Sequence, residues 1–353
     1  MRKTHTTTIG SVKIGHGHAV AIQSMCNTKT EDVQATVAQI LALEKEGCDL
    51  IRVAVPTKEA SAALPKIKSQ IHIPLIADIH FHAGLALDAL EAGADKIRIN
   101  PGNIDQNDLL DQIIEKAQAQ NTCIRIGVNA GSLEQELWDK YGAPTAEAMV
   151  ESTLNWLKYF QDRDFNNLVI SIKSAEVPTM IRAYELIADQ CDIPLHLGVT
   201  AAGLLFEGSI KNAIGIGTLL HQGIGDTIRV SLTADPIEEV KAAKEILKSL
   251  NLYSKEPQIV SCPTCGRTEI DVIGMTKKVK EMIAREKIQK PLRIAVMGCV
   301  VNALGEAKES DFAIAGGRKQ GNIYYQGELF KGNIPEDQLL DEFLKLIREK
   351  IKA

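Results

Sequence analysis

The chain has 353 residues, of which 45% are apolar and 24% are charged, so its composition is that of an ordinary globular protein. At roughly 100–200 residues per domain, this length predicts two domains or one large barrel with an appendage. The net charge of −5 argues against a nucleic-acid partner, because phosphate contacts need a basic field. No apolar run approaches the roughly 20 residues that span a bilayer and the first residues lack an apolar signal core, so we expect a cytoplasmic protein with no membrane partner.

Short runs rich in Val and Ile alternate with helix-like segments from residue 19 to about residue 250. The eight strand candidates are Ala19–Ser24, Leu50–Val55, Leu75–Ile79, Lys96–Asn100, Cys123–Val128, Leu168–Lys173, Leu195–Val199 and Thr227–Ser231. A helix candidate follows each strand, namely Glu31–Glu46, Lys58–Gln70, Gly84–Ala92, Asp108–Gln120, Thr145–Asp162, Pro178–Gln190, Leu204–Gln222 and Pro236–Leu250.

Eight β-α units in series is the count of a TIM barrel. An open doubly wound sheet is the alternative, but it usually has fewer units and a glycine-rich first turn, which this chain lacks. The preceding segment Thr6–Ile14 has Gly10-Ser11 between two β-prone runs and predicts a hairpin that closes the floor of the barrel.

The alternating pattern ends near Tyr253–Pro257, and the sequence beyond it predicts a small α+β domain. Its strand candidates are Gln258–Ser261, Leu292–Met297, Asp311–Ala315 and Asn322–Gln326, and its helix candidates are Glu269–Arg285 and Glu336–Ile351. We therefore expect a barrel domain over residues 1–254 and a second domain over residues 255–353.

Cations recur inside the predicted barrel strands. An arginine stands between aliphatic residues in four strands, and a lysine ends a fifth: Arg52, Arg98, Arg125, Arg229 and Lys173. One such arginine could face outward and pair with a helix carboxylate, but four in the same pattern argue against that. Because buried cations are costly, their convergence on one rim implies an anionic ligand, and the planar fork of arginine suits a diphosphate.

Other polar residues are predicted at the same strand ends: Gln23, Ser24, Asp78, His80, His82, Asn100, Asn129, His196, Thr200 and Ser231. His80 and His82 alternate along one strand, so both could face a metal ion. Hydrogen-bonded rim histidines are the commoner case, and we do not count these two as ligands.

Seven cysteines are an odd number and too few for a disulfide scaffold, so reduced thiols or metal ligands are expected. Cys262-Pro-Thr-Cys265 follows one predicted strand and Cys299 follows the next, so three thiolates can meet at strand ends. No histidine follows His221, which excludes a zinc site of three cysteines and a histidine within this domain. The fourth ligand is an oxygen, an exogenous group or a barrel cysteine, and Glu306, expected in a glycine-flanked loop, is the nearest candidate.

Three thiolates and a carboxylate suit a [4Fe-4S] cluster with one distinctive iron better than structural zinc, which prefers nitrogen and sulfur throughout. A thioredoxin-type redox pair is a further alternative, but its βαβ context is missing.

With these motifs assembled, the chain resembles the bacterial IspG/GcpE family of 4-hydroxy-3-methylbut-2-enyl diphosphate synthases, essentially from end to end and without an inserted middle domain. The segments that carry the resemblance are Arg98–Asn103, Arg125–Glu134, Gly225–Ser231, Cys262–Cys265, Gly298–Asn302 and Gly305–Glu306. The resemblance implies a TIM barrel followed by an iron–sulfur domain. It also implies the two-electron reductive ring opening and dehydration of 2-C-methyl-erythritol 2,4-cyclodiphosphate to hydroxymethylbutenyl diphosphate, in the non-mevalonate isoprenoid pathway.

The same resemblance implies roles for single residues. A [4Fe-4S] cluster is expected on Cys262, Cys265, Cys299 and Glu306, with Glu306 yielding to a substrate oxygen. The residues expected to bind the cyclic diphosphate are Arg52, Asp78, Arg98, Asn100, Arg125, Asn129, Lys173, His196, Arg229 and Ser231. Reduced flavodoxin or ferredoxin is the expected electron donor, and a homodimer is expected in which each cluster domain closes over the partner's barrel.

One position departs from the family pattern. The family reads Gly-Val-Thr-Glu-Ala-Gly where this chain has Ala201 in place of the glutamate, and family members use that carboxylate to deliver a proton during loss of water. Our hypothesis is an engineered inactivating substitution that retains binding and lowers turnover by about 10²–10⁴. The alternative is a natural variant in which Glu207 or Asp78 takes over.

Two other functions are alternatives to this one. A phosphate-binding TIM-barrel synthase or aldolase of the dihydropteroate type, with a structural zinc domain, explains the arginines but leaves Glu306 without a role. An iron–sulfur scaffold or redox sensor explains the cysteines, and tight diphosphate binding would distinguish an enzyme from it.

Overall fold

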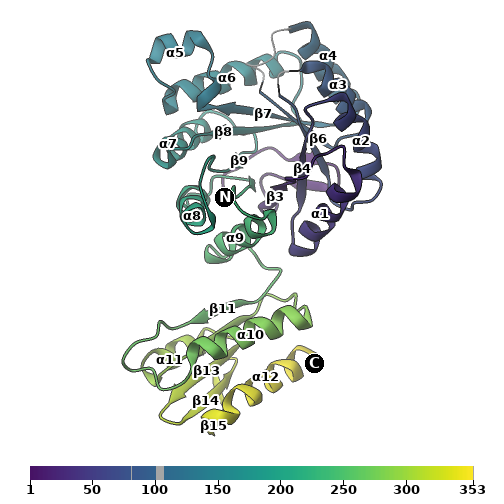
Figure 1. Cartoon of the computed structure of the whole chain (residues 1–353). Helices are drawn as coiled ribbons and strands as arrows, with labels where there is room; N and C mark the ends of the chain where they lie inside the picture. Colours follow the sequence, from purple (N-terminus) through teal and green to yellow (C-terminus); the bar gives the residue numbers. More distant parts are fainter. Residues whose placement is uncertain (81, 101–106, 353) are drawn as a thin grey trace. The chain divides into compact units, whose positions relative to one another are not determined.

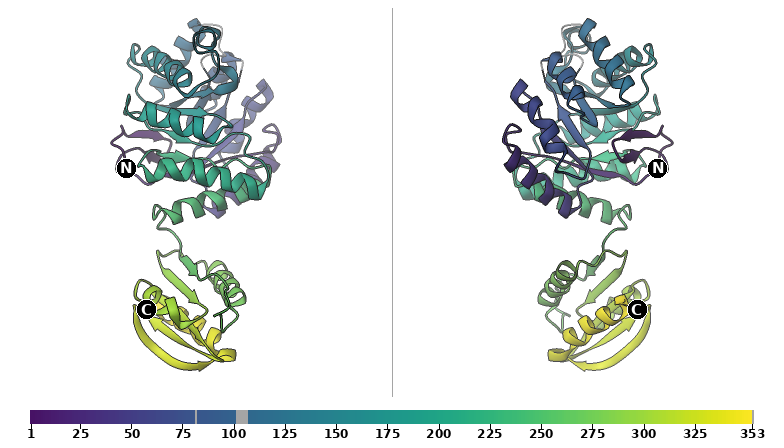
Figure 2. Two further views of the ribbon diagram at one scale, coloured as in Figure 1. Left: turned by 90° about the vertical axis from the view of Figure 1, so that its left-hand side faces the viewer. Right: turned by 90° about the vertical axis from the view of Figure 1, so that its right-hand side faces the viewer.

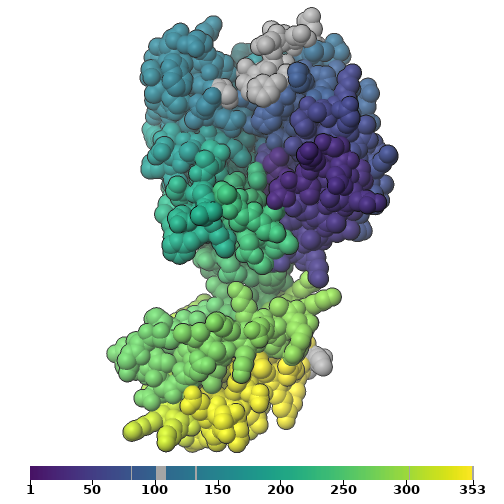
Figure 3. Space-filling view, in the orientation of Figure 1, coloured from purple at the N-terminus to yellow at the C-terminus, as the bar shows by residue number. Residues whose placement is uncertain are grey.

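The structure, a computed structural model, describes residues 1–80, 82–100 and 107–352. The chain divides into two compact units, Met1–Leu252 and Tyr253–Ala353, which are drawn as ribbons in Figure 1 and as space-filling atoms in Figure 3. Each unit has its own sheet and core and is described by itself. Within the described ranges, no helix is both long and apolar enough to cross a membrane.

The first unit is built on eight parallel strands in the order β8-β7-β6-β5-β4-β3-β10-β9. Their bounds are β3 Ala21–Met25, β4 Leu50–Ala54, β5 Leu75–Asp78, β6 Lys96–Ile99, β7 Cys123–Asn129, β8 Leu168–Lys173, β9 His196–Leu197 and β10 Thr227–Ile228. An isolated bridge between Ile170 of β8 and Leu195 joins the two ends of this row, so the strands form a nearly closed barrel. The predicted TIM barrel is confirmed, although β9 and β10 are shorter than the sequence suggested.

Helices cover the outside of this barrel (Figure 1). They are α1 Val33–Glu46, α2 Lys58–Lys68, α3 Ala83–Glu91, α4 Asn107–Ala119, α6 Ala146–Gln161, α7 Val177–Ala188, α8 Leu205–His221 and α9 Pro236–Ser249. Local signals begin and end them: Asp32 caps α1 by accepting a hydrogen bond from Ala35 N, and Gly47 ends it with φ 104°. A short 3-10 turn (Ala130–Ser132) and α5 (Gln135–Tyr141) lie between β7 and α6 and were not predicted.

The predicted hairpin is confirmed as β1 (Thr7–Ile9) and β2 (Val12–Ile14), which pair antiparallel. Ile9 and Ile14 are buried against the first or second residue of five barrel strands, namely Ala21, Leu50, Ile76, Cys123 and Val169. The hairpin therefore closes the floor of the barrel and leaves the opposite end, where the strands finish, for a binding site. Figure 2 shows it in dark purple beside the N-terminus.

The second unit is an α+β domain with one five-stranded sheet in the order β11-β12-β13-β14-β15. Its strands are β11 Gln258–Ser261, β12 Arg293–Met297, β13 Phe312–Gly317, β14 Gln320–Tyr325 and β15 Glu328–Pro335, and the first three are parallel. Its helices are α10 Val272–Glu286, α11 Val300–Lys308 and α12 Glu336–Lys352. The predicted class is confirmed, but α11 and β15 were missed.

Alternation along β12 divides this unit into two cores. Ile294 and Val296 pack with residues of α10 and α12 on one face of the sheet. Ala295 and Met297 pack with α11 on the other face. The sheet is therefore covered on both sides, and the polar ends of β11 and β12 meet at one edge.

Candidate functional site

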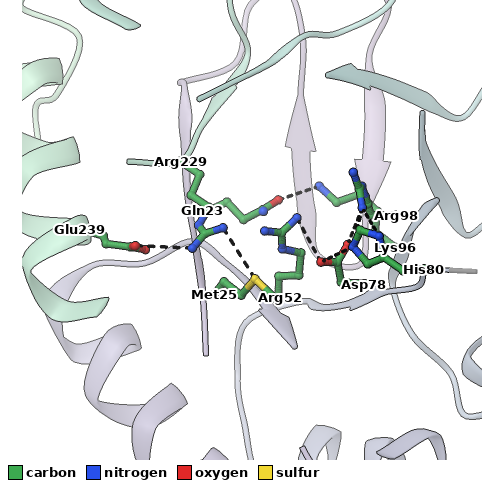
Figure 4. A network of polar contacts seen from close by, with 9 residues as sticks. All are labelled: Gln23, Met25, Arg52, Asp78, His80, Lys96, Arg98, Arg229 and Glu239. Atoms are coloured by element: carbon green, nitrogen blue, oxygen red, sulfur yellow. Dashed lines mark hydrogen bonds and ion pairs between the residues drawn. The ribbon is translucent and has the colours of Figure 1, made fainter. Parts of the chain in front are cut away.

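Five cations come from the barrel strands or the residue after one, but not all of them lie where a strand finishes, because Arg52 is the third of the five residues of β4 and Arg125 the third of the seven residues of β7. Arg52 is on β4, Arg98 on β6 and Arg125 on β7, while Lys173 ends β8 and Arg229 follows β10. Burial, together with the four arginines, lowers the pKa of Lys173 well below its usual value, so all five lie within electrostatic range. Figure 4 shows Arg52 and Arg98 on neighbouring sides of Asp78, and Arg229 between Glu239 and Met25.

A single aspartate, Asp78 at the end of β5, lies among these cations. Its oxygens are 3.6 Å from Arg52 Nη1 and 3.5 Å from Arg98 Nη1. Burial alone would raise the pKa of Asp78, but Arg52, His80 and Arg98 hold it well below its usual range. Asp78 is therefore ionised, and it orients two guanidinium groups without neutralising the whole set.

Arg125 feels the charge of Asp78 but has no hydrogen bond to it. Its side chain is wholly buried, and among the described residues none of its three guanidinium nitrogens has a hydrogen-bond partner. Burial, then the neighbouring Arg52 and Arg98, lowers its pKa well below the usual value. A buried donor left unpaired costs about 1–3 kcal/mol, and more when charged. An anion bound at this level of the barrel would accept these hydrogen bonds.

Lys96 lies beneath the arginines and was not among the expected site residues. Its wholly buried Nζ donates to Gln23 Oε1 over 3.1 Å, and burial lowers its pKa to about 7. A signal for it exists in the sequence, because Lys96 stands two residues before Arg98 on β6 and strand alternation puts both on the same face.

Glu239 is a second residue that the sequence reasoning missed. It projects from α9, with its Oε1 3.5 Å from Arg229 Nη2, and it accepts a hydrogen bond from Leu232 N over 3.0 Å. Arg229 also approaches Met25 Sδ at 3.7 Å, as Figure 4 shows. Strand patterns carry no information about a helix carboxylate, so nothing in the sequence pointed to Glu239.

Asn100, Asn129 and Ser231, which were expected at the rim, lie at strand ends, whereas His196 stands at the start of β9, level with Ala21 at the start of β3. Asn100 follows β6, Asn129 ends β7 and Ser231 follows β10. His196 begins β9 and is buried, with Nδ1 2.7 Å from Thr227 Oγ1 and with Nε2 unpartnered among the described residues. Burial, then Arg125 and Lys173, lowers the pKa of His196 well below its usual value, so the ring is neutral.

A glycine makes room for one of the arginines. A Cβ added at Gly127 of β7 would lie 2.6 Å from Arg98 Nε, closer than real side chains approach. The guanidinium of Arg98 therefore passes over a strand position that only glycine leaves open. Residues 101–103 of the motif that begins at Arg98 lie outside the described residues.

Ala201 lies in the turn between β9 and α8, exposed and with φ 51°. Its methyl group cannot transfer a proton. Asp78 is held ionised by its arginines, which argues against it as a replacement donor. Glu207 lies in the first turn of α8 and is exposed.

The second unit brings three cysteines to one edge of its sheet. Cys262 and Cys265 follow β11, and Cys299 is the N-cap of α11, just after the adjacent parallel strand β12. Gly298 N donates to Cys262 Sγ over 3.1 Å, and a Cβ at Gly298 would clash with Val272 at 2.6 Å. Hydrogen bonding from the backbone of Arg267 lowers the pKa of the exposed Cys265, which favours its thiolate.

Glu306 does not lie in a loop, as the sequence suggested, but within α11. This prediction was wrong because Ala303 and Ala307 pack against the sheet and hold a helix through Gly305. Glu306 is seven residues past Cys299, about 10 Å along the helix. There its Oε2 is 3.1 Å from Nη2 of Arg293, the first residue of β12, at the far end of the strand from the cysteines.

The three cysteines therefore fit an iron–sulfur cluster, whereas the fourth expected ligand, Glu306, does not lie with them. Across the described chain, no three His, Cys, Asp or Glu side chains lie close enough to hold one metal ion. A cluster presents separate irons at its corners, so three thiols along one edge suit it better than they suit a single zinc ion. The fourth donor, Glu306, is engaged elsewhere.

Comparison with known proteins covers both units. The GcpE TIM-barrel domain matches residues 4–244, and the GcpE protein C-terminal domain matches residues 258–349. The chain is 52% identical over 353 residues to a 4-hydroxy-3-methylbut-2-en-1-yl diphosphate synthase (flavodoxin) of Caldanaerobacter subterraneus subsp. tengcongensis, covering 100% of this chain and 99% of that one. A protein of the same name from Geobacillus thermodenitrificans is 50% identical over 345 residues, covering 98% of this chain and 91% of that one.

A solved dihydropteroate synthase from Stenotrophomonas maltophilia aligns with a TM-score of 0.50 and 16% identity, over 70% of this chain and 98% of that one. That likeness concerns the fold alone. Because two GcpE domains match in series along nearly the whole chain, the protein belongs to the GcpE family.

Proposed function

We propose that this protein is a reductase that converts 2-C-methyl-erythritol 2,4-cyclodiphosphate to 4-hydroxy-3-methylbut-2-enyl diphosphate. Two electrons and two protons enter, a ring C–O bond breaks and one water leaves, so atoms and charge balance. The observation that carries this proposal is the set of buried, under-neutralised cations at the barrel rim, in a chain whose curated relatives are named for that product. A diphosphate supplies the acceptors that these cations lack.

The charged and the neutral side chains of the barrel site have different roles in substrate binding. Arg52, Arg98, Arg125, Arg229 and Lys173 hold the phosphoryl oxygens, and Asp78 keeps two of the guanidinium groups aimed. The neutral side chains of Asn100, Asn129, His196 and Ser231 contact the remaining oxygens of the substrate. Because the arginines are placed before any ligand arrives, little reorganisation opposes binding.

Cys262, Cys265 and Cys299 hold a [4Fe-4S] cluster, which supplies single electrons and a Lewis-acidic iron when bound. Glu306 is the proposed fourth ligand. To reach the cysteine edge it must leave Arg293, so ligation requires the ion pair to open and the helix around Gly305 to rearrange. Arg293 then keeps a second carboxylate, since its Nη2 is also 3.5 Å from Glu309 Oε2.

Reduced flavodoxin or ferredoxin is the proposed electron donor, and the relatives are named as flavodoxin enzymes. Exposed lysines on α10 of the second unit support an acidic carrier. Lys277, Lys278 and Lys280 are exposed on α10, and none has an ion-pair partner among the described residues. We further propose a cytoplasmic homodimer in which each cluster domain closes over the partner's barrel.

An anaerobic turnover assay tests this function. The reduced protein is mixed with the cyclodiphosphate, and the product is identified by phosphorus NMR and mass spectrometry. We expect slow formation of the linear diphosphate, and about 10²- to 10⁴-fold faster formation by Ala201→Glu, because a general acid is restored. No product from an Ala201→Glu protein that carries its full complement of iron would refute the proposal.

A further inference from the structure

The residues that follow β10 are held differently from the other residues of the barrel site. Arg52 and Arg125 stand inside strands of five and seven residues, which pair with a neighbouring strand on each side. β10 ends at Ile228 after two residues, so Arg229 and Ser231 lie in a loop. Two of the residues proposed to bind the diphosphate therefore depend on contacts outside the sheet for their position.

The loop that joins β10 to α9, residues 229–235, is tied to its surroundings by hydrogen bonds. Three consecutive residues each bond a different partner: Ser231 O accepts from Asn212 Nδ2 over 3.2 Å, Leu232 N donates to Glu239 Oε1 over 3.0 Å, and Thr233 N donates to Gly203 O over 2.8 Å. These partners belong to α8, to α9 and to the turn between β9 and α8. The amide of Asn212 donates to backbone oxygens, whereas Glu239 also faces a charged side chain of the loop.

Glu239 is buried and makes three contacts with its two carboxylate oxygens. Oε1, which accepts the hydrogen bond from Leu232 N, is also 3.5 Å from Arg229 Nη2. Oε2 accepts from Ser24 Oγ of β3 over 3.4 Å. Figure 4 shows Arg229 between Glu239 and Met25. One carboxylate thereby joins the loop backbone, the guanidinium of the same loop and a barrel strand.

We propose that Glu239 is a positioning residue for the diphosphate, which acts by accepting the hydrogen bond of Leu232 N and so holds Arg229 and Ser231 in the barrel site. The bond to Leu232 N has an ordinary length, whereas the contact with Arg229 is at the outer limit for a hydrogen bond. Breaking a buried bond of this kind leaves a donor unpaired, which is costly. The inference rests on the function proposed above and adds the residue that presents two of its substrate ligands.

The carboxylate could act on this loop through its reach or through its charge, and two substitutions separate these properties. Glu239→Gln keeps the length of the side chain and an oxygen that accepts from Leu232 N, but it removes the charge. Glu239→Asp keeps the charge, but its carboxylate is withdrawn by one methylene, about 1.5 Å, and no longer reaches Leu232 N. Both changes are small enough for the barrel to fold.

Calorimetric titration of the oxidised, cluster-loaded protein with the cyclodiphosphate measures binding without turnover. We expect Glu239→Asp to raise the dissociation constant about tenfold, and Glu239→Gln to stay within about threefold of the unsubstituted chain. Glu238→Ala is the matched control, because this neighbouring carboxylate of α9 pairs with Lys241 at the surface. Weak binding by Glu239→Gln with normal binding by Glu239→Asp would contradict the proposed hydrogen bond, and unchanged affinity in both would overturn the proposal.

A double-substitution cycle distinguishes positioning from general destabilisation. Ser231→Ala alone should weaken diphosphate binding about 3- to 10-fold, but it should add little in the Glu239→Asp protein, because Ser231 is already displaced there. In turnover, Glu239→Asp should raise KM about tenfold and leave kcat within about twofold, because the loop contacts substrate oxygens that do not react. Independent losses from the two substitutions would contradict the coupling.

Hydrogen–deuterium exchange tests the loop without any ligand. The peptide that covers residues 229–235 should exchange faster in Glu239→Asp than in the unsubstituted chain and in Glu239→Gln, while peptides of β4 and β7 stay unchanged. A chain that binds no cyclodiphosphate while its loop shows this pattern would refute the proposed function. Normal binding with equal exchange in all three proteins would refute only the role of Glu239.

Discussion

The two candidate sites of this protein are prepared to different degrees. In the barrel, five cations are already gathered; four of them are buried, Asp78 and Glu239 pair with three of them, and a glycine clears space for Arg98. At the cysteine edge, the thiols are partly exposed and the proposed fourth ligand is paired with Arg293 at the far end of a strand. Rigid parallel strands can hold several cations close together before a ligand binds and neutralises them. A cluster site, in contrast, reaches its final geometry only when the cluster binds.

The largest expected effect is a loss of cluster and turnover without a loss of diphosphate binding. Cys299→Ser removes one thiolate ligand, so we expect the iron content to fall sharply and turnover to drop by more than about 10³-fold. The affinity for the cyclodiphosphate, measured by calorimetry, should change less than about threefold, because the barrel rim does not depend on this cysteine. A loss of diphosphate binding would show that the two sites are one.

The converse change lies in the barrel. Arg125→Met should weaken diphosphate binding by about 100-fold, because buried charge-assisted hydrogen bonds are lost. It should also raise the free energy of unfolding by about 1–4 kcal/mol, because an unpartnered buried cation is replaced by an apolar side chain of similar length. Thermal denaturation measures the change in the free energy of unfolding, and iron counts show that the variant and the unsubstituted chain carry the same cluster content. A destabilised Arg125→Met protein would contradict the view that Arg125 serves ligand binding at a cost in stability.

A smaller effect concerns the basic surface of α10. The double variant Lys277→Glu with Lys280→Glu should slow turnover driven by reduced flavodoxin about tenfold and steepen its loss with salt. Turnover driven by dithionite should be unchanged, because a small reductant needs no docking surface. Equal losses with both reductants would indicate damage to the fold rather than to donor docking.

The last effect is a pH dependence of the stability of the barrel unit, which is spread over several pH units. Because the pKa of Lys96 falls from 10.5 to about 7 on folding, the unfolded chain binds one more proton between these values. The free energy of unfolding therefore rises with pH through this window, by at most about 1.4 kcal/mol per pH unit from this residue. Lys96→Met should flatten that rise in the thermal midpoint between pH 7 and 10. An unchanged slope would mean that Lys96 keeps its proton in the folded barrel.

The barrel was predictable because its signal repeats. Eight apolar strands alternate with helices along the chain. Because these strands form one barrel, arginines at similar positions of several strands come close together. Lys96 shared that strand pattern and could have been found by alternation alone. Glu239 could not, because a helix residue reaches the site only through the packing of α9 on the barrel.

The second unit was harder to predict for a different reason. The segment Val300–Lys308 contains two valines and a glycine, which are poor helix formers, and it becomes α11 because its alanines pack on β12 and β13. Tertiary contacts thus decided where Glu306 lies. The β15 strand was missed because six of its residues in a row are exposed, which leaves no alternation of apolar and polar positions.

An anaerobic EPR spectrum of the dithionite-reduced protein, with and without the cyclodiphosphate and alongside iron and sulfide counts, tests the central claim most directly. We expect about four irons per chain and a signal that changes when the cyclodiphosphate is added, whatever the effect of Ala201 on turnover. Zinc in place of iron, or a reconstituted protein without sulfide or signal, would contradict it.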